Sequence, residues 1–342
     1  MIQRFSTTAS GEPGNGTLIC QCYDNKTKFS KIHAQYPLKF IPTKGHADRL
    51  AVVYMISYGG GIVSGDQFQV QIDILPKAIL LLLTQGNTKI FKDPSSTATT
   101  TIQNKNGKKM EDTSTQTIKA TISAGGILIN MPDPVTSFKD SSFTSKQIIH
   151  LQDNTSQLVL LDWFTSGRMS RGEQWQFKYY ASRIDIYLDQ KLKIKDHMVL
   201  EDSCNNNNGL EQQEEENDRN NDDDDKETKE TSYAAKLKPY ACFATLIIIA
   251  SDHTATAEKK SPLYQSIHTI LKKSEDMRML PHSMKKEKDL LWSVSPCLND
   301  RGVLIRMAGM TTEMVRDFIK LECLGQGLKD IVGDGMFGKI LM

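Results

Sequence analysis

The alternation of apolar and polar residues along the chain predicts β-strands. Between Gln67 and Ile74 every even position is apolar and every odd position is polar, which is the period of a strand with one buried face. Residues 78–83 then form an unbroken apolar run after a Leu-Pro-Lys turn, as expected for a strand buried on both faces. This region therefore predicts two consecutive strands joined by a tight turn.

The same kind of pattern recurs through most of the chain. Short segments rich in β-branched or aromatic residues are separated by Gly, Pro, Asn or Asp. Strands that follow one another without intervening helices favour an antiparallel body. The predicted strands are residues 50–58, 97–102, 113–122, 126–131, 145–151, 157–164, 175–180, 291–294 and 303–307, with a hairpin turn at 104–107.

Helical periodicity is present in two places, both in the last third of the chain. Apolar residues recur at helical spacing over 263–271, after Pro262, and over 314–321, after a Thr-Thr pair that can cap a helix. The predicted fold class is therefore mainly β, with about two α-helices in the C-terminal third.

Charge is distributed unevenly, although the formal net charge is only +1. Residues 205–230 carry eleven acidic and three basic residues, so this stretch is −8 and the remainder is +9. We expect 203–232 to be an acidic, Asn-rich disordered insertion, because it has too few large apolar residues to offset the entropy of ordering. Residues 325–342 are predicted to be a flexible tail. The basic remainder favours an acidic protein partner over nucleic acid, since its Lys and Arg residues are dispersed along the sequence.

Cysteine, histidine and hydropathy patterns indicate no strong metal site and no membrane segment. The six cysteines include no C-x-x-C pair, and the histidines show no helical ligand spacing. His46 and Asp48 come closest to a ligand pair, with an exposed loop as the simpler interpretation. No signal peptide or membrane span is evident, so a cytoplasmic location is expected.

The glycine-rich segment 59–65 is not a phosphate-binding loop. Its glycines lack the spacing of G-x-x-x-x-G-K-[S/T] or G-x-G-x-x-G, and a strand rather than a helix follows. We therefore predict a tight β turn that presents Asp66, and we expect no nucleotide hydrolysis by this chain.

Four sequence blocks, taken together, resemble the UreD (also called UreH) family of urease accessory proteins. They are G-G-I-V-S-G-D with L-L-T-Q-G-N-T-K-I-F at 60–91, N-M-P-D-P-V with Phe138 at 130–138, D-W-F-T-S-G-R through R-G-E and W-Q-F at 162–177, and G-V-L-I-R at 302–306. The resemblance implies a β-helix-like stack of sheets within a single domain, 1–342. It also implies a urease maturation scaffold rather than an enzyme.

The same resemblance implies partners and a cargo. The partners would be urease apoprotein, a UreF-like accessory protein and, through it, a UreG-like GTPase, with neither nucleic acid nor membrane involved. Nickel would be a transient cargo that passes through the protein, with no tightly bound cofactor.

A conduit must bind an ion weakly enough to release it, so isolated carboxylates suit transit better than a His/Cys cluster. Asp66, Glu173 and Asp162 are the candidate nickel-route carboxylates, although Asp66 is equally well explained as a turn residue. Arg168, Arg171 and Tyr58 are candidate partner-binding residues, with structural ion pairs as the alternative for the two arginines.

Two other functions remain open from the sequence. One is a purely structural bridging scaffold of the same family, with no metal conduction. The other, more remote, is a β-helical carbohydrate-active enzyme that uses Asp162 and Glu173 as acid and base. Aromatic residues make up only 7% of the chain, which disfavours a sugar-binding groove.

Overall fold

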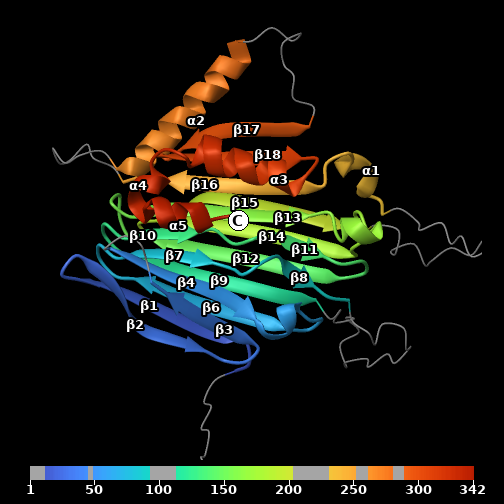
Figure 1. Ribbon diagram of the computed structural model, residues 1–342, viewed down its shortest axis with the longest axis horizontal. Coiled ribbons are helices and arrows are strands. Elements are labelled where there is room, and N and C mark those ends of the chain that lie inside the picture. The colour runs from blue at the N-terminus through green and yellow to red at the C-terminus, as the bar shows by residue number, and fades with distance from the viewer. Residues whose placement is uncertain (1–11, 45–48, 93–112, 203–230, 252–260, 280–288) are drawn as a thin grey trace, which may run out of the picture.

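Two stacked β-sheets form the body of the protein (Figure 1). The computed structural model describes residues 12–44, 49–92, 113–202, 231–251, 261–279 and 289–342. We call the first sheet, with strand order β15-β14-β12-β9-β6-β1-β2, sheet A. Its strands are β1 (Asn15–Tyr23), β2 (Lys26–Ala34), β6 (Gln67–Ile74), β9 (Ser114–Ile122), β12 (Ser142–Leu151), β14 (Tyr179–Leu188) and β15 (Lys191–Glu201).

The second sheet, sheet B, runs in the order β17-β18-β16-β13-β10-β7-β4-β3, and three very short strands pair beside it. Its strands are β3 (Leu38–Thr43), β4 (Leu50–Ser57), β7 (Ile79–Leu83), β10 (Ile127–Asn130), β13 (Gln157–Thr165), β16 (Cys242–Ile249), β17 (Leu290–Cys297) and β18 (Gly302–Gly309). The short strands are β5 (Gly61–Ile62), β8 (Thr88–Ile90) and β11 (Val135–Ser137).

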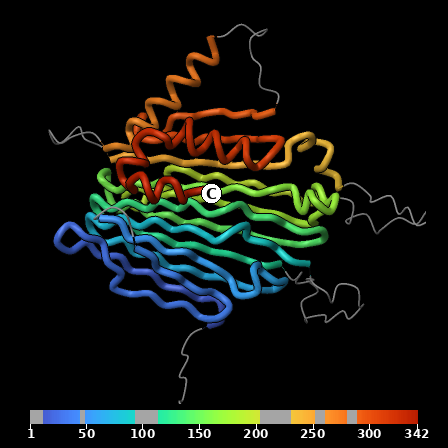
Figure 2. The backbone as a smooth tube through the Cα atoms, in the orientation of Figure 1, coloured from blue at the N-terminus to red at the C-terminus, as the bar shows by residue number. Residues whose placement is uncertain are grey.

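The centre of both sheets is parallel, so the prediction of an antiparallel body is wrong there. Strands β1, β6, β9, β12 and β14 pair in parallel within sheet A, and β4, β7, β10 and β13 do so within sheet B. From β6 to β14 the chain passes alternately between the two sheets, so each return to the same sheet comes after a complete coil and runs in the same direction. Figure 2 shows this stepwise climb from the blue N-terminal coils to the green ones. The predicted β-helix-like stack is confirmed.

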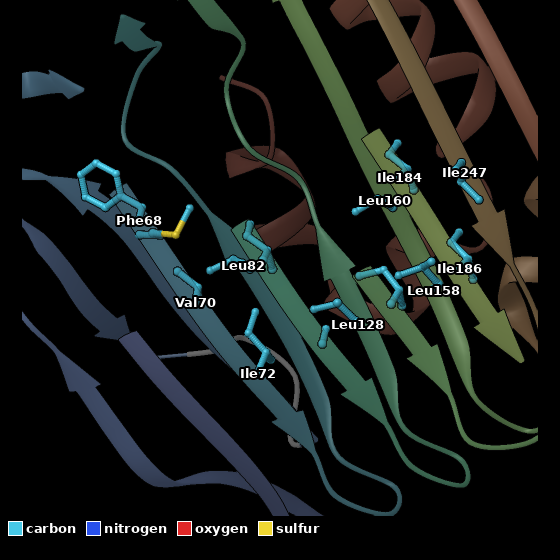
Figure 3. Packing of buried hydrophobic residues seen from close by; sticks show 14 of the residues in the cluster. Phe68, Val70, Ile72, Leu82, Leu128, Leu158, Leu160, Ile184, Ile186 and Ile247 are labelled. Atoms are coloured by element: carbon cyan, nitrogen blue, oxygen red, sulfur yellow. The ribbon is translucent and has the colours of Figure 1, made fainter. Parts of the chain in front are cut away.

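A continuous hydrophobic core fills the space between the sheets. The even-numbered residues of β6 point inward from sheet A, as their alternation predicts, and meet Leu82, Leu128, Leu158 and Leu160 from sheet B (Figure 3). Strand β7 is buried along its whole length, which confirms the interpretation of 78–83, because its other face lies under the helices.

Five α-helices lie in the described C-terminal part, and most of them cover the outer face of sheet B (Figure 1). The long helix α2 and the helical run that begins with α3 match the two predicted helices. None of the described helices is long and apolar enough to cross a membrane. The helices are α1 (Ala234–Leu237), α2 (Pro262–Met279), α3 (Thr312–Asp317), which continues as the π-helix η6 (Phe318–Cys323), α4 (Leu328–Val332) and α5 (Asp334–Lys339).

The segment 325–342 differs from the predicted flexible tail. It forms α4 and α5, and Leu328, Val332 and Met336 are buried in the core over sheet B. The physical reason is that these apolar side chains recur at helical spacing and complete the cover of the sheet, a pattern too short to identify with certainty from sequence.

Several other expectations have different outcomes. Residues 175–178 precede β14 as a buried loop rather than a strand, and strands β1 to β3 were not predicted. The predicted strand 97–102, the hairpin turn at 104–107, His46 with Asp48, and most of the acidic insertion (203–230) lie outside the described residues. That 1–342 form a single domain stays a prediction.

Candidate functional site

The first three sequence blocks of the family resemblance come together at one end of the stack. Gly61 of β5 pairs with Lys89 of β8, and Val135 of β11 pairs with both Thr88 and Phe164. The glycine turn beside them requires its glycines, because Gly59 and Gly60 have positive φ angles of 82° and 75°. Segments far apart in the sequence therefore build one local structure.

Asp66 is a turn residue in this structure. The backbone N–H of Val63 donates to its Oδ2 at 3.0 Å, and its own N–H donates back to the Val63 carbonyl oxygen at 3.0 Å. This reciprocal pair of bonds closes the turn before β6, which is the structural alternative given for Asp66. Its carboxylate is half-buried and already engaged.

Glu173 forms an ion pair with Arg168 inside the W-x-x-x-G-R block. The Arg168 Nε donates to Glu173 Oε2 at 2.8 Å, its Nη2 donates to Oε1, and its guanidinium lies 4.1 Å from the centre of the Phe138 ring. Burial alone would raise the pKa of Glu173, but hydrogen bonds from Arg168 and the Lys139 N–H outweigh it, so the pKa lies below its ordinary value. Glu173 is thus ionised and neutralised by its partner, and Arg168 is a structural residue as well as a candidate anchor.

The other two candidate partner-binding residues lie on the surface. Arg171 is exposed at the end of the short 3-10 helix η3 (Met169–Arg171). Tyr58 is 51% exposed, its ring centre lies 5.4 Å from that of Tyr36, and both rings border an open groove with Lys39. These positions are accessible to a partner, whereas the guanidinium of Arg168 is already bound to Glu173 and packed against Phe138.

Asp162 lies between the two sheets, apart from the turn of Asp66 and the ion pair of Glu173. It occupies the inward phase of β13 together with Leu160 and Phe164, and the hydroxyl of Ser182 on sheet A donates a hydrogen bond to its Oδ2. The residue as a whole is half-buried, and protein surrounds its carboxylate. Burial raises its pKa to about 6, the Ser182 bond lowers it, and the negative charge of Asp196 raises it.

Register extends Asp162 into a row of inward-facing polar residues. On sheet A, Gln116 pairs with Ser145, and Ser145 pairs with Ser182; on sheet B, Asp162 pairs with Thr245, and Thr245 pairs with Arg306. A second polar pair lies next to this row. The amide of Asn130, which pairs with Leu160, donates to Oε1 of Gln147, two residues after Ser145, at 3.0 Å. We call these residues, together with Asp196, the polar stripe: Gln116, Asn130, Ser145, Gln147, Asp162, Ser182, Asp196, Thr245 and Arg306.

The polar stripe crosses the strands from the middle of sheet A, at β9, to its edge at β15. At one end, Gln116 lines a small cavity with Thr84 and Thr88. At the other end, Arg306 donates to Asp196 Oδ1 at 2.5 Å, and the guanidinium side chain of Arg306 is 54% exposed. The row of polar residues therefore extends from a small pocket to a charged, solvent-facing pair.

Sequence reasoning found only Asp162 among these residues. The available signal was the phase of β12, where Ser145 and Gln147 occupy the same face as Ile149 and Leu151. Polar residues in the inward phase of a strand mark polar contacts inside the core, but the sequence alone did not show which face was inward.

The donor set of the stripe suits weak cation binding. Its oxygens come from carboxylates, amides and hydroxyls, and no group of three or more His, Cys, Asp or Glu residues that could hold a metal occurs in the described parts of the chain. Burial raises the pKa of Cys20 and Cys242 to about 12 and that of Cys297 to about 11, so these thiols stay protonated near neutral pH.

This chain is similar to urease accessory proteins of plants and fungi. The sequence profile of the UreD urease accessory protein matches residues 12–326. "Urease accessory protein D" of Arabidopsis thaliana is 27% identical over 323 residues, which cover 90% of this chain and 94% of the relative. "Urease accessory protein 4" of Cryptococcus neoformans is 26% identical over 340 residues, covering 96% and 95% of the two chains. The chain belongs to the UreD urease accessory protein family.

Proposed function

We propose that this chain is a urease maturation scaffold that passes nickel along the polar stripe. It would bind urease apoprotein and a UreF-like protein, and the UreF-like protein would recruit a UreG-like GTPase that supplies the nickel. Family membership and the names of the relatives support the general role in urease maturation. The specific partners and the internal route belong to this proposal.

The polar stripe is the observation that carries the route. Buried polar groups cost stability unless they are hydrogen-bonded, and the stripe keeps bonded polar pairs, Asn130–Gln147 and Ser182–Asp162, where an apolar core would need none. Passage of an ion would explain such a row. Its weak oxygen donors can exchange an ion from one to the next, as a conduit requires. The carboxylate of Asp162 supplies negative charge that would draw a divalent cation inward, whereas Asp196 is paired with Arg306 at the end of the stripe.

Asp66 and Glu173 are weaker candidates for the route than Asp162. Asp66 closes a turn at the end of the stack and Glu173 is neutralised by Arg168, whereas Asp162 lies within the stripe and accepts from the neutral hydroxyl of Ser182. In this proposal both residues shape the end of the stack, and Asp162 is the principal carboxylate of the route.

Affinity capture of the tagged full-length chain tests the scaffold role. The chain would be co-expressed with urease apoprotein and the UreF-like and UreG-like proteins, and recovery of urease in the captured complex is expected. A complex without any urease subunit would contradict the proposed function.

The alternative within the family is a bridging scaffold that conducts no metal. Thr245→Phe places a bulky ring in the stripe at a half-buried position, whereas Ser293→Phe places the same ring in register on the exposed strand β17. With complex assembly intact, we expect urease activation at limiting nickel to fall only for Thr245→Phe. Equal activation by the two variants would favour the bridging scaffold.

A further inference from the structure

The outer face of sheet A is open along the described part of the chain. The buried residues of α2 to α5 belong to the core over sheet B, and Ala234 of α1 belongs to the core between the sheets. Most outward-facing residues of sheet A are polar and exposed or half-exposed. This broad, flat surface therefore has no cover among the described elements.

Register gathers basic residues on this face that are dispersed along the sequence. Lys146 of β12 pairs with Thr117 on one side and Arg183 on the other, while Lys119 and Lys195 lie one row away on β9 and β15. We call the outward residues Lys31, Lys119, Lys146, Arg183, Lys195, His33, His150 and His197 the basic face. The acidic residues that share it are Asp73, Asp185 and Glu201.

Two cations on the basic face are direct neighbours. Lys146 and Arg183 occupy matched positions on adjacent parallel strands, and like charges at such positions repel each other. Asp185 offsets part of this repulsion, because Arg183 Nε donates to its Oδ2 at 2.7 Å. Because Asp185 neutralises Arg183, the net positive charge of the face comes mainly from Lys31, Lys119, Lys146 and Lys195. The arrangement leaves a net positive face that folding alone does not require.

We infer that the basic face binds an acidic surface of a protein partner in the urease maturation complex. This inference rests on the proposed function, because that function supplies the class of partner. Complementary charge across an interface speeds encounter and excludes wrong partners, which suits a scaffold that assembles several proteins. The face spans the seven strands of sheet A, roughly 30 Å across at the usual strand spacing, which is wide enough for a protein interface of ordinary size.

The chemistry of the face favours protein over nucleic acid. Sheets that bind single-stranded RNA stack bases on exposed aromatic rings. On the basic face the Tyr187 ring is half-buried and stacks on His150, with ring centres 4.7 Å apart. The exposed ring of Tyr23 lies on β1, two strands away from Lys119 on β9.

Charge reversal on two faces tests the inference. Lys119→Glu with Lys146→Glu changes the basic face, and Lys272→Glu with Arg278→Glu makes the same change in net charge on the exposed side of α2. Purified urease apoprotein, UreF-like protein and UreG-like protein would each be titrated with full-length wild type and both double variants, at low and high NaCl. Circular dichroism would check that the variants fold.

We expect the basic-face variant to weaken binding of one partner by about tenfold or more at low salt, while the α2 variant stays near wild type. The wild-type affinity for that partner should fall at high salt, and the loss of affinity caused by charge reversal should shrink.

Equal affinities for wild type and both variants would overturn the inference that the basic face binds a partner and would leave the proposed function standing. If the wild type bound none of the three proteins, the proposed function would fail, and the acidic partner with it. Binding of a mixed-sequence single-stranded RNA that only the basic-face variant loses, with protein binding unchanged, would assign the face to nucleic acid instead.

Discussion

The two faces of sheet B are both buried, but they are built differently. Strand β13 displays the contrast along a single segment: Val159, Leu161 and Trp163 point toward the helices, whereas Asp162 points between the sheets. The helix-covered face is almost wholly apolar, and Trp163 satisfies its indole N–H with the Pro132 carbonyl oxygen at 2.8 Å. The inter-sheet face carries the polar stripe through an otherwise apolar core.

This difference indicates that the helix-covered face stabilises the protein, whereas the polar inter-sheet face costs stability. Apolar burial stabilises a fold roughly in proportion to the area removed from water, so the helix-covered face contributes stability at every position. A buried carboxylate with a raised pKa lowers the stability of the fold near neutral pH, because its charged form is disfavoured in the folded state. Four predictions test this contrast by measurements of stability, and the last three add urease activation.

The largest expected effect is on the helix-covered face. Leu161→Ala removes a fully buried side chain and leaves a cavity, so we expect the free energy of unfolding to fall by about 2–5 kcal/mol in urea titrations. Ile305→Val on the same face is the milder control, with an expected loss of about 0.5–1.5 kcal/mol. If Leu161→Ala lost less free energy of unfolding than Ile305→Val, this face would be loosely packed.

The second prediction concerns the charge of Asp162. Its pKa of about 6 in the folded protein lies above the ordinary value of 3.8, so the folded state holds the proton more tightly than the unfolded state. Asp162 therefore destabilises the fold progressively as pH rises from about 4 to about 6, and the full cost remains at neutral pH. Asp162→Asn should raise the free energy of unfolding at pH 7.5 by about 1–3 kcal/mol, and this gain should vanish toward pH 4.

Ser182→Ala provides the matched test of that pH dependence. The Ser182 hydroxyl is the hydrogen-bond donor that lowers the pKa of Asp162, so its removal should shift the transition to higher pH. Urease activation should fall for Asp162→Asn despite its greater stability. An Asp162→Asn variant with the stability profile of wild type at every pH would show that this carboxylate bears no cost, and the contrast between the two faces would lose its main support.

The sequence predicts individual strands and helices better than it predicts which strands pair with each other. Alternation located β6, and helical spacing located α2, because each pattern is set within a few residues. The parallel centre could not be predicted that way, since it depends on which of two sheets each strand joins. The polar stripe was missed for the same reason: Gln147 and Ser182 look like ordinary outward residues until the facing sheet is known.

The third prediction separates the turn at Asp66 from the stripe. Asp66→Ala removes the acceptor of the Val63 N–H, so we expect a loss of about 0.5–1.5 kcal/mol in the free energy of unfolding. Asp66→Asn keeps an acceptor oxygen and should restore most of that stability. Urease activation should follow the amount of folded protein in both variants. If Asp66→Asn were as stable as wild type but failed to activate urease, the Asp66 carboxylate would again be a candidate for the nickel route.

The smallest expected change in stability gives the sharpest comparison. Asn130→Leu combined with Gln147→Met replaces both partners of a buried hydrogen bond by apolar groups of similar size, and such paired replacements are nearly neutral for stability. We expect the free energy of unfolding to stay within about 1 kcal/mol of wild type. We expect urease activation at limiting nickel to fall, because the double variant interrupts the row of oxygen donors.

The control for this double variant is Leu161→Met, a volume-conserving change on the other face of sheet B. Both proteins should fold and capture urease equally, so that only the chemistry of the interior differs between them. Normal activation by the double variant would mean that the Asn130–Gln147 pair sets the register of the two sheets without serving a passage. Loss of activation with unchanged folding and assembly would instead separate the two faces of sheet B by function, since an interior kept polar at a cost in stability would then be needed for metal transfer.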